Sequence, residues 1–387
     1  MSDRERYGVA LLDWLACAAA GSAEPAARAA REAGDGLLDR VTAAGCAGHV
    51  LDYDDTYTPG LVHASAAAAP AAVVLAAELG RDLDAALEAF AAGWEAAAAF
   101  ARASHPDLYE RGWHPTAVCG TVGAAVSASL LLELEDEAAR AALALALLRA
   151  GGLRAAFGSA GKAIQVGAAA AAGVQSARLA AAGARAPLEA VAQGPAGFEA
   201  AFGGAWAEPD GPPAIGENWI KAYPCCLGAH SPIEAALAVR ASGRDPLTDG
   251  RAITVVVHPR ARQAAALDDV ADGLEAKFSI PYLSAFTLLH GAPGIGDFDG
   301  VDRRAAELAR TSVAVALDPA IGEMEARLES GDETLARVET ALGSPARPMD
   351  AERLRAKLHE LAGDRLDGVL DDPSAPARAV LLAAGLA

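Results

Sequence analysis

The chain has 387 residues, which is long enough for two or three domain-sized units with a large buried core. Its formal net charge is −19. This charge argues against nucleic acid or an anionic membrane as a partner, because binding to either requires a basic surface. An anionic substrate would have to be held by a few local cations, so the positions of those cations are informative.

Lysine is rare in this chain. Only four of the 32 basic residues are lysine, and the others are arginine. Three of the lysines, Lys162, Lys221 and Lys277, lie in segments that also contain histidine, tyrosine or closely spaced glycines, whereas Lys357 lies in an amphipathic helical pattern. We therefore expect at least some of the lysines to have a functional role.

The five cysteines form no CxxC pair, and adjacent Cys225 and Cys226 are poorly spaced for a structural zinc site. Free thiols in a reducing cytoplasm are expected, with no metal. The apolar stretch near the N-terminus is interrupted by Asp13, which disfavours a signal peptide. Charges or helix breakers also interrupt the alanine-rich runs before they reach the ~20 apolar residues of a membrane span.

The first half of the chain predicts successive helices, because Leu, Val and Ala recur at helical spacing from Tyr7 to about Ala201. A Pro- and Gly-rich stretch after Gly204 marks a boundary. Helical patterns and short apolar runs alternate beyond it, with strands expected within 252–259, 312–319 and 339–345. The predicted fold is mainly α. A large all-helical domain over 1–215, onto which a C-terminal helix at 366–387 packs back, is joined to a smaller α+β domain over 216–365.

An acidic loop at 51–63 contains Asp52, Asp54, Asp55, Thr56 and His63. Clustered acids repel one another, and burial would raise the pKa of at least one of them into a range suited to proton transfer. Helix capping or a calcium-like loop is the alternative for Asp54 and Asp55. Asp52 and His63 are the stronger candidates for a site.

His114 precedes Pro115, which fits the first position of a helix. The helix dipole disfavours the cationic form of a histidine placed there, leaving a neutral imidazole that accepts a proton. Lys162 lies among Gly158, Gly161 and Gly167 at the start of another expected helix. A phosphate-binding loop is disfavoured because Ala163 replaces the Ser or Thr of that motif. An ammonium beside backbone N–H groups suits a carboxylate instead.

Two later segments combine a lysine with a second polar residue. The segment 221–230 contains Lys221, Cys226 and His230, and the segment 276–282 contains Lys277 and Tyr282. Packing is the alternative role for Tyr282, whose neighbours are apolar. The other histidines have no comparable polar neighbours in the sequence and are expected to be structural; they are His49, His105, His258, His290 and His359.

These segments, in this order, resemble the MmgE/PrpD family, which includes 2-methylcitrate dehydratase, cis-aconitate decarboxylase and iminodisuccinate epimerase. The resemblance is carried by LDYDDT, GWHPTAVCGTVGAA, GKAIQVGAAAAAG, KAYPCCLGAHSPIEAA and AKFSIPY. It runs from about Leu11 to Tyr282 and fades beyond Phe286.

The resemblance implies a helical domain covered by an α+β lid, an active site between them, no metal or other cofactor, and a homodimer. It also implies a set of site residues. The catalytic candidates are His114, Lys162, Asp52 and Tyr282. The substrate-binding candidates are Thr56, His63, His230, Lys277 and Cys226, with His230 and Cys226 as alternatives for one position.

The expected reaction is removal of a proton next to a carboxylate of a small polycarboxylate. Lys162 and Thr56 would hold that carboxylate, and His114 or Asp52 would take the proton. Dehydration of the 2-methylcitrate type ranks first, ahead of epimerisation and then decarboxylation. The alternatives from other classes are a non-catalytic small-acid-binding protein and, less favoured, a nucleotide-dependent enzyme.

Overall fold

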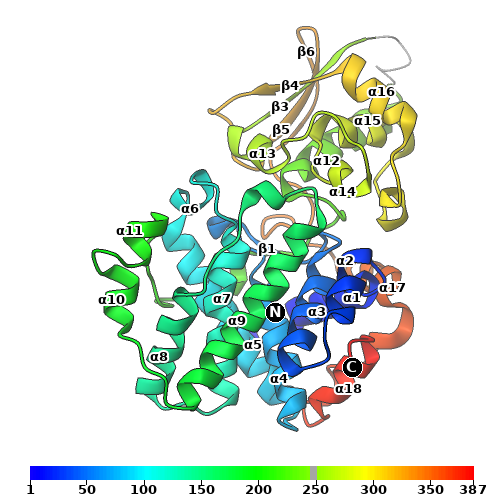
Figure 1. Cartoon of the computed structure of the whole chain (residues 1–387). Coiled ribbons are helices and arrows are strands. Elements are labelled where there is room, and N and C mark those ends of the chain that lie inside the picture. Colours follow the sequence, from blue (N-terminus) through cyan, green and yellow to red (C-terminus); the bar gives the residue numbers. More distant parts are fainter. Residues whose placement is uncertain (245–250) are drawn as a thin grey trace.

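The computed structural model describes residues 1–244 and 251–387. A helical body carries a smaller α+β lid, which lies at the top of Figure 1. The two parts have separate hydrophobic cores. The predicted mainly α fold with a smaller α+β domain is confirmed.

Most of the body is formed by the first half of the chain. Its helices are α1 (Asp3–Gly21), α2 (Pro25–Glu32), α3 (Leu37–His49), α4 (Ala64–Glu78), α5 (Leu83–Ser104), α6 (Asp107–Glu110), α7 (Pro115–Leu131), α8 (Asp136–Leu147), α9 (Ala160–Ala181), α10 (Leu188–Gln193) and α11 (Phe198–Phe202). His114 lies just before α7 and Lys162 lies in the first turn of α9, and the starts of both helices were expected from the sequence.

Small residues allow α7 and α9 to approach closely. A Cβ atom added at Gly173 of α9 would lie 2.6 Å from the carbonyl oxygen of Thr121 in α7. Likewise, a Cβ at Gly167 would lie 2.2 Å from the carbonyl oxygen of Thr42 in α3. Such separations are too short for any side chain, so glycine is required where these helices cross. The crossings fix α9 against the end of α3 and therefore position Lys162.

The lid contains a four-stranded sheet in the order β4-β3-β5-β6, in which β3 and β4 are parallel and the other pairs antiparallel. Its helices α12 and α15 pack on this sheet. The lid elements are α12 (His230–Ala241), β3 (Ile253–Val257), α13 (Pro259–Ala264), α14 (Gly273–Ala276), α15 (Ile280–His290), α16 (Arg303–Ser312), β4 (Val313–Leu317), β5 (Ala326–Ser330) and β6 (Glu333–Val338).

A two-stranded antiparallel sheet connects the acidic loop of the body to the segment that enters the lid. It consists of β1 (Thr56–Tyr57) and β2 (Asn218–Trp219), with Thr56 opposite Trp219. Asn218 also donates through its side chain to Asp55, 2.7 Å away. The acidic loop is therefore tied to the point where the chain passes from the body to the lid.

The C-terminal part differs from expectation in two details. Residues 339–345 form turns rather than a strand, and the last two strands are the hairpin of β5 and β6. In addition, α17 (Ala351–Ala362) packs against α1 of the body, although the sequence placed it in the lid domain.

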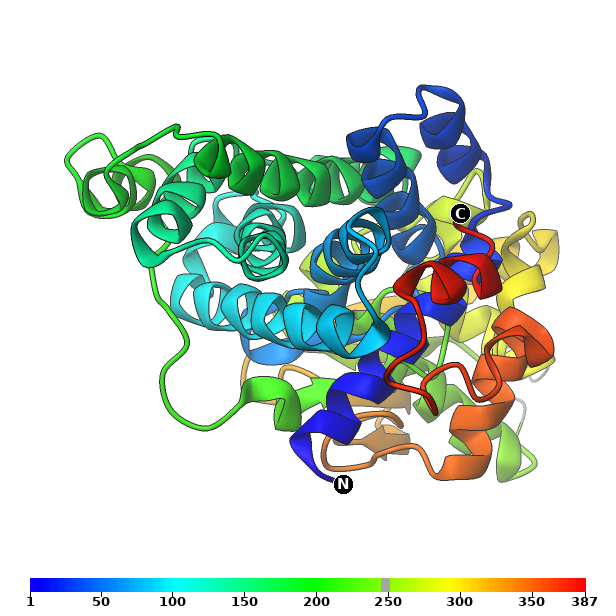
Figure 2. The ribbon, with the colours of Figure 1, turned by 90° about the horizontal axis from the view of Figure 1, so that it is seen from below.

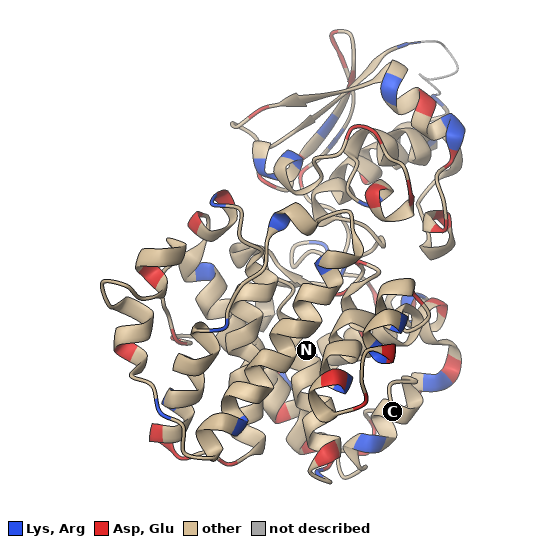
Figure 3. Cartoon of the chain, viewed as in Figure 1, with Lys and Arg blue, Asp and Glu red and all other residues tan. Residues whose placement is uncertain are grey.

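The chain end also returns to the body, as Figure 2 shows from below. There α18 (Ala377–Ala383) packs against α4, and Leu361 and Leu381 join the core of the body. Acidic and basic residues are interspersed on the side seen in Figure 3. None of the helices in the described part of the chain combines the length and apolarity that a membrane span requires.

Candidate functional site

The acidic loop leaves the end of α3 with an unusual backbone conformation. Asp52 has a φ of 53°, in the left-handed region that residues other than glycine rarely adopt. Its side chain is only 4% exposed. A strained, buried and charged residue persists only where its surroundings hold it in place, and such residues cluster at functional sites.

All four lysines of the chain converge on this loop. Three successive carbonyl oxygens accept hydrogen bonds, each from a different ammonium group: Leu51 from Lys277 (2.9 Å), Asp52 from Lys221 (2.6 Å) and Tyr53 from Lys357 (2.9 Å). The fourth lysine, Lys162, reaches the Asp52 carboxylate at 3.1 Å. The lysines come from the body, the lid and α17, so the loop lies where these parts meet.

The Asp52 carboxylate lies between two ammonium groups. Its Oδ1 atom is 3.1 Å from Lys162 Nζ and 3.1 Å from Lys221 Nζ. Burial disfavours the charged carboxylate, but the two lysines outweigh this cost and hold the pKa of Asp52 well below its ordinary value. Asp52 is therefore an ionised partner for the lysines.

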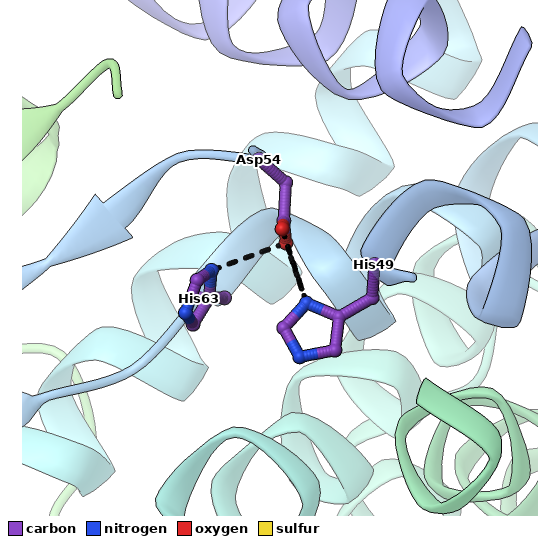
Figure 4. Close-up of side chains that lie close together, drawn as sticks. All are labelled: His49, Asp54 and His63. Atoms are coloured by element: carbon purple, nitrogen blue, oxygen red, sulfur yellow. Dashed lines mark hydrogen bonds and ion pairs between the residues drawn. The ribbon is translucent and has the colours of Figure 1, made fainter. Parts of the chain in front are cut away.

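Asp54 binds two imidazoles at once, as Figure 4 shows. Its Oδ2 atom lies 2.9 Å from His49 Nδ1 and 3.2 Å from His63 Nδ1. Burial alone would raise the pKa of Asp54, but His49 and His63 together hold it well below the ordinary value. An ionised carboxylate only accepts hydrogen bonds, so both Nδ1 atoms carry the proton and both Nε2 atoms are free to accept.

The neutral form of both histidines follows mainly from burial. Desolvation lowers the pKa of His49 from 6.5 to about 4 and lowers the pKa of His63 as well, despite the opposing charge of Asp54. His49 Nε2 lies 2.6 Å from Lys162 Nζ, so it accepts from that ammonium. His63 Nε2 lies 3.6 Å from Asp52 Oδ1, and Thr56 Oγ1 lies 3.5 Å from His63 Nδ1.

His114 is held in the opposite tautomer. The Gln165 carbonyl oxygen accepts from the backbone N–H of Leu153 at 2.9 Å, and its amide nitrogen donates to the Leu153 carbonyl oxygen at 3.2 Å. This orientation directs the same amide nitrogen to His114 Nδ1, 2.7 Å away. Nδ1 is therefore the acceptor, and the proton of the neutral ring is on Nε2. Burial, followed by the charge of Lys162, keeps the pKa of His114 well below 6.5.

A cavity between the body and the lid brings these groups together. The body contributes Asp52, Thr56, Leu61, His63, Tyr109, His114, Thr116, Phe157 and Lys162. The lid contributes Cys226, Leu227, Gly228, Arg260, Ala261, Ala264, Phe278 and Met324. Charged groups on a mostly apolar wall are typical of a small-ligand site, because a few polar contacts orient the ligand while the wall excludes water.

Lys162 faces this cavity through its side chain. The backbone N–H groups of Gly161 and Lys162 both donate to Ser159, so the first turn of α9 is already capped by the chain. The cation offered to a ligand is thus the ammonium group rather than the helix N-terminus. Its nitrogen lies 5.6 Å from the ring centre of Phe157 and 5.8 Å from that of Phe278, so aromatic rings flank it.

Six of the residues singled out in the sequence line the cavity. They are Asp52, Thr56, His63, His114, Lys162 and Cys226. Cys226 is a thiol at neutral pH, because burial raises its pKa to about 11.

Three other candidates lie outside the cavity lining. Lys277 donates to the carbonyl oxygens of Leu51 and Pro224, and His230 Nε2 lies 3.3 Å from a backbone carbonyl oxygen in the lid. The Tyr282 hydroxyl accepts from the backbone N–H of Asp302 at 3.0 Å. In this structure these three side chains form hydrogen bonds with backbone groups.

The structure also adds residues that sequence reasoning missed. His49 was expected to be structural because it lies outside the polar segments singled out in the sequence, and its partner Lys162 lies 113 residues later. Gln165 lies one helical turn after Lys162, a spacing that places both on one face of α9. Arg260 carried no signal, because it is one of many arginines.

Among residues 1–244 and 251–387, His49, Asp54 and His63 form a group whose possible metal-ligand atoms lie within 4.8 Å of one another. The hydrogen bonds from both Nδ1 atoms to Asp54 already use these ligand atoms. Lys162 and Lys221 lie close by, and their positive charges would oppose a divalent cation. These residues fit a hydrogen-bonded cluster better than a metal centre.

Comparisons with known proteins identify the family of the chain. The model of the MmgE/PrpD N-terminal domain matches residues 37–208, and that of the MmgE/PrpD C-terminal domain matches residues 223–373. The second match extends well beyond Phe286, where the resemblance was expected to fade.

Two curated relatives are cis-aconitate decarboxylases. The protein from Mus musculus is 28% identical over 357 residues, which cover 83% of this chain and 71% of the relative. The protein from Homo sapiens is 33% identical over 215 residues, which cover 51% of this chain and 43% of the relative. With both family domains matched in order along the chain, this protein belongs to the MmgE/PrpD family.

Proposed function

We propose that this protein is a lyase that acts on a small polycarboxylic acid through proton transfer at a carbon next to a carboxylate. The observation that carries this proposal is the combination, in one cavity, of the Lys162 ammonium with the imidazoles of His63 and His114, which are held in opposite tautomers. The family and the names of the two relatives also support an acidic substrate.

Two cations lie on different walls of the cavity. Lys162 is on the body, and Arg260 is on α13 of the lid, where it is paired with Glu323. A substrate with two or more carboxylates would contact both, with one carboxylate on Lys162 and another displacing Glu323 from Arg260. Charge gathers on the first carboxylate as the neighbouring proton leaves, and the ammonium stabilises that charge.

The hydrogen-bond pattern favours His63 as the proton acceptor. Its Nε2 atom has a free lone pair, because Asp54 holds the proton on Nδ1. Asp52 is a weak base because two lysines hold its pKa low. The Nε2–H group of His114 is a hydrogen-bond donor, so we assign it to the substrate oxygen or the leaving group rather than to the proton-accepting role expected from the sequence.

Dehydration and decarboxylation are the two lyase outcomes, and epimerisation is the isomerase alternative. In a dehydration, His63 takes the α-proton and the electron pair of the broken C–H bond forms the double bond. The β-hydroxyl, which accepts a hydrogen bond from neutral His114, leaves with the proton that His63 took, and water is the product. In a decarboxylation, the electron pair comes from the broken carbon–carbon bond, carbon dioxide leaves, and the carbon that receives the pair takes a proton. The site chemistry suits dehydration, and the names of both relatives favour decarboxylation.

Product analysis separates these outcomes. Incubation with 2-methylcitrate, cis-aconitate and iminodisuccinate, followed by proton NMR and by measurement of released carbon dioxide, distinguishes dehydration, decarboxylation and epimerisation. Binding of these acids by calorimetry without turnover of any of them would instead support a non-catalytic small-acid-binding protein. A homodimer is a further expectation from the family resemblance, and light scattering would test it. A cytoplasmic location is the expectation from the unpaired cysteines.

A further inference from the structure

We propose that His49 is a positioning residue that aims the Lys162 ammonium into the cavity through a buried chain of hydrogen bonds from Asp54. The chain runs from the Asp54 carboxylate to His49 Nδ1–H, and from His49 Nε2 to Lys162 Nζ. The catalytic consequence rests on the proposed function, but the hydrogen-bond chain itself can be tested without turnover.

The first link determines how the ring can act. Asp54 and His49 are both fully buried, with side chains that are 0% exposed. The two oxygens of Asp54 lie 3.1 Å and 2.9 Å from His49 Nδ1. Since the carboxylate cannot donate, the ring proton is on Nδ1 and Nε2 presents its lone pair. A carboxylate that selects a histidine tautomer in this way also occurs in hydrolase triads, where it orients the ring.

The second link fixes the direction of the ammonium. Lys162 donates one N–H to His49 Nε2 at 2.6 Å and another to Asp52 Oδ1 at 3.1 Å. An ammonium has three N–H groups in tetrahedral geometry, and within 1–244 and 251–387 these two acceptors are its side-chain hydrogen-bond partners. The remaining N–H therefore points toward the cavity that Lys162 lines.

A lysine side chain has a large rotamer entropy, so an ammonium held at two points loses less entropy when a substrate carboxylate arrives. His49 supplies a neutral acceptor for this purpose, whereas a second carboxylate would reduce the net positive charge at the site. Asp54 also binds His63, so one carboxylate selects the tautomers of the ring that aims the lysine and of the ring assigned as proton acceptor.

The tautomer is measured directly by NMR of protein labelled with ¹⁵N-histidine, with His49 assigned from the signal that His49→Gln removes. We expect His49 Nδ1 to carry the proton at neutral pH and Nε2 to carry none. A proton on His49 Nε2 would overturn the proposal, because Nε2 could not then accept from Lys162. This measurement is independent of whether a substrate is known.

Two substitutions separate positioning from packing. In His49→Gln, the amide nitrogen can donate to Asp54 and the carbonyl oxygen can accept from Lys162, whereas His49→Leu can do neither. We expect His49→Leu to lower kcat on the order of 10²-fold with a smaller change in KM, as for the loss of one aligned donor to a developing charge. His49→Gln should recover most of this loss. His290→Gln, in an exposed part of the lid, is the matched control.

Outcomes for the two proposals are distinct. A His49→Leu variant that folds and keeps wild-type kcat would show that the hydrogen-bond chain has no catalytic role, while wild-type turnover still supported the proposed function. If wild type turns over none of the acids, the proposed function fails, and calorimetry with tricarballylate tests the inference instead. Weaker tricarballylate binding is then expected in His49→Leu but not in His49→Gln. Equal binding by wild type and both variants would contradict the positioning role of His49.

Discussion

The Lys221 ammonium donates two hydrogen bonds to Asp52, one to its carbonyl oxygen at 2.6 Å and one to its carboxylate at 3.1 Å. This contact holds a left-handed backbone and a buried charge together. Desolvation disfavours the charged form of Lys221, but the combined attraction of Asp52 and other nearby groups, including Asp54, outweighs it and raises the pKa of Lys221, so the ammonium stays charged. Lys162 reaches the same carboxylate from the body and also faces the cavity. The two lysines therefore have separable roles.

Lys162→Met and Lys221→Met should have different effects. In Lys162→Met, Asp52 keeps Lys221 as its partner, so we expect turnover to be lost with a modest fall in stability. In Lys221→Met, the Asp52 carboxylate keeps Lys162 as its partner, but the buried Asp52 carbonyl oxygen loses its ammonium donor, so the free energy of unfolding should fall by a further ~1–3 kcal/mol. Urea denaturation and turnover assays check both. Equal stability of the two variants would contradict this division of roles.

Arg260→Gln should raise KM for a tricarboxylate on the order of tenfold, because it removes one charge-assisted contact to a carboxylate. Glu323→Gln should lower KM, because Arg260 no longer has a competing carboxylate partner. Arg262→Gln is the matched control, since Arg262 pairs with Asp268 and is absent from the cavity lining. Steady-state kinetics with cis-aconitate measure all three, and an unchanged KM in Arg260→Gln would remove Arg260 from the site.

Acid should destabilise the fold through its buried histidines. Burial lowers the pKa of His230 from 6.5 to about 3. Between these values the unfolded chain binds a proton that the folded chain does not. The free energy of unfolding should therefore fall as the pH falls below 6.5, by up to about 1.4 kcal/mol per pH unit for this group.

The comparison of wild type with His230→Gln isolates this effect. Asp55, whose pKa burial raises to about 7, contributes the opposite slope, but it does so in both proteins. Urea denaturation at pH 7, 6 and 5 should show a shallower decline in His230→Gln. The same decline in both proteins would mean that His230 does not titrate as predicted.

The ion pair between Lys357 and Asp13 should stabilise the packing of α17 on α1. Lys357 Nζ lies 2.6 Å from Asp13 Oδ1, and both side chains are almost fully buried. Lys357→Met leaves a buried carboxylate without its partner, for which we expect a loss of about 3–5 kcal/mol. Asp13→Asn combined with Lys357→Met should recover part of it. Loss of under about 1 kcal/mol in the single variant, as for a surface pair, would contradict this prediction.

Much of this architecture could be predicted from local patterns. Pro115 after His114 and the glycines around Lys162 indicated the starts of two helices, and both starts are confirmed. The rarity of lysine also pointed toward the site. The contacts of the lysines could not be read from the sequence, because Lys357 lies 304 residues after Tyr53 and donates to its carbonyl oxygen.

Other features depend on packing that no local pattern encodes. His49 looked structural because its partners Asp54 and Lys162 meet it only when α3 and α9 cross at glycine contacts. The tautomer of His114 depends on Gln165, whose amide is oriented by the backbone of Leu153. Tyr282 is the opposite case. The sequence placed it among the catalytic candidates, but its hydroxyl accepts a hydrogen bond within the lid.

The central claim is proton transfer at a carbon next to a carboxylate, with His63 as the acceptor. It is tested most directly by proton NMR of the protein with 2-methylcitrate, cis-aconitate and iminodisuccinate in deuterated water. We expect wild type to exchange or convert at least one of these acids, and His63→Gln and His114→Gln to lose this activity while keeping the wild-type circular-dichroism spectrum. Absence of exchange and turnover with every polycarboxylate tried, or full activity in His63→Gln, would contradict the account.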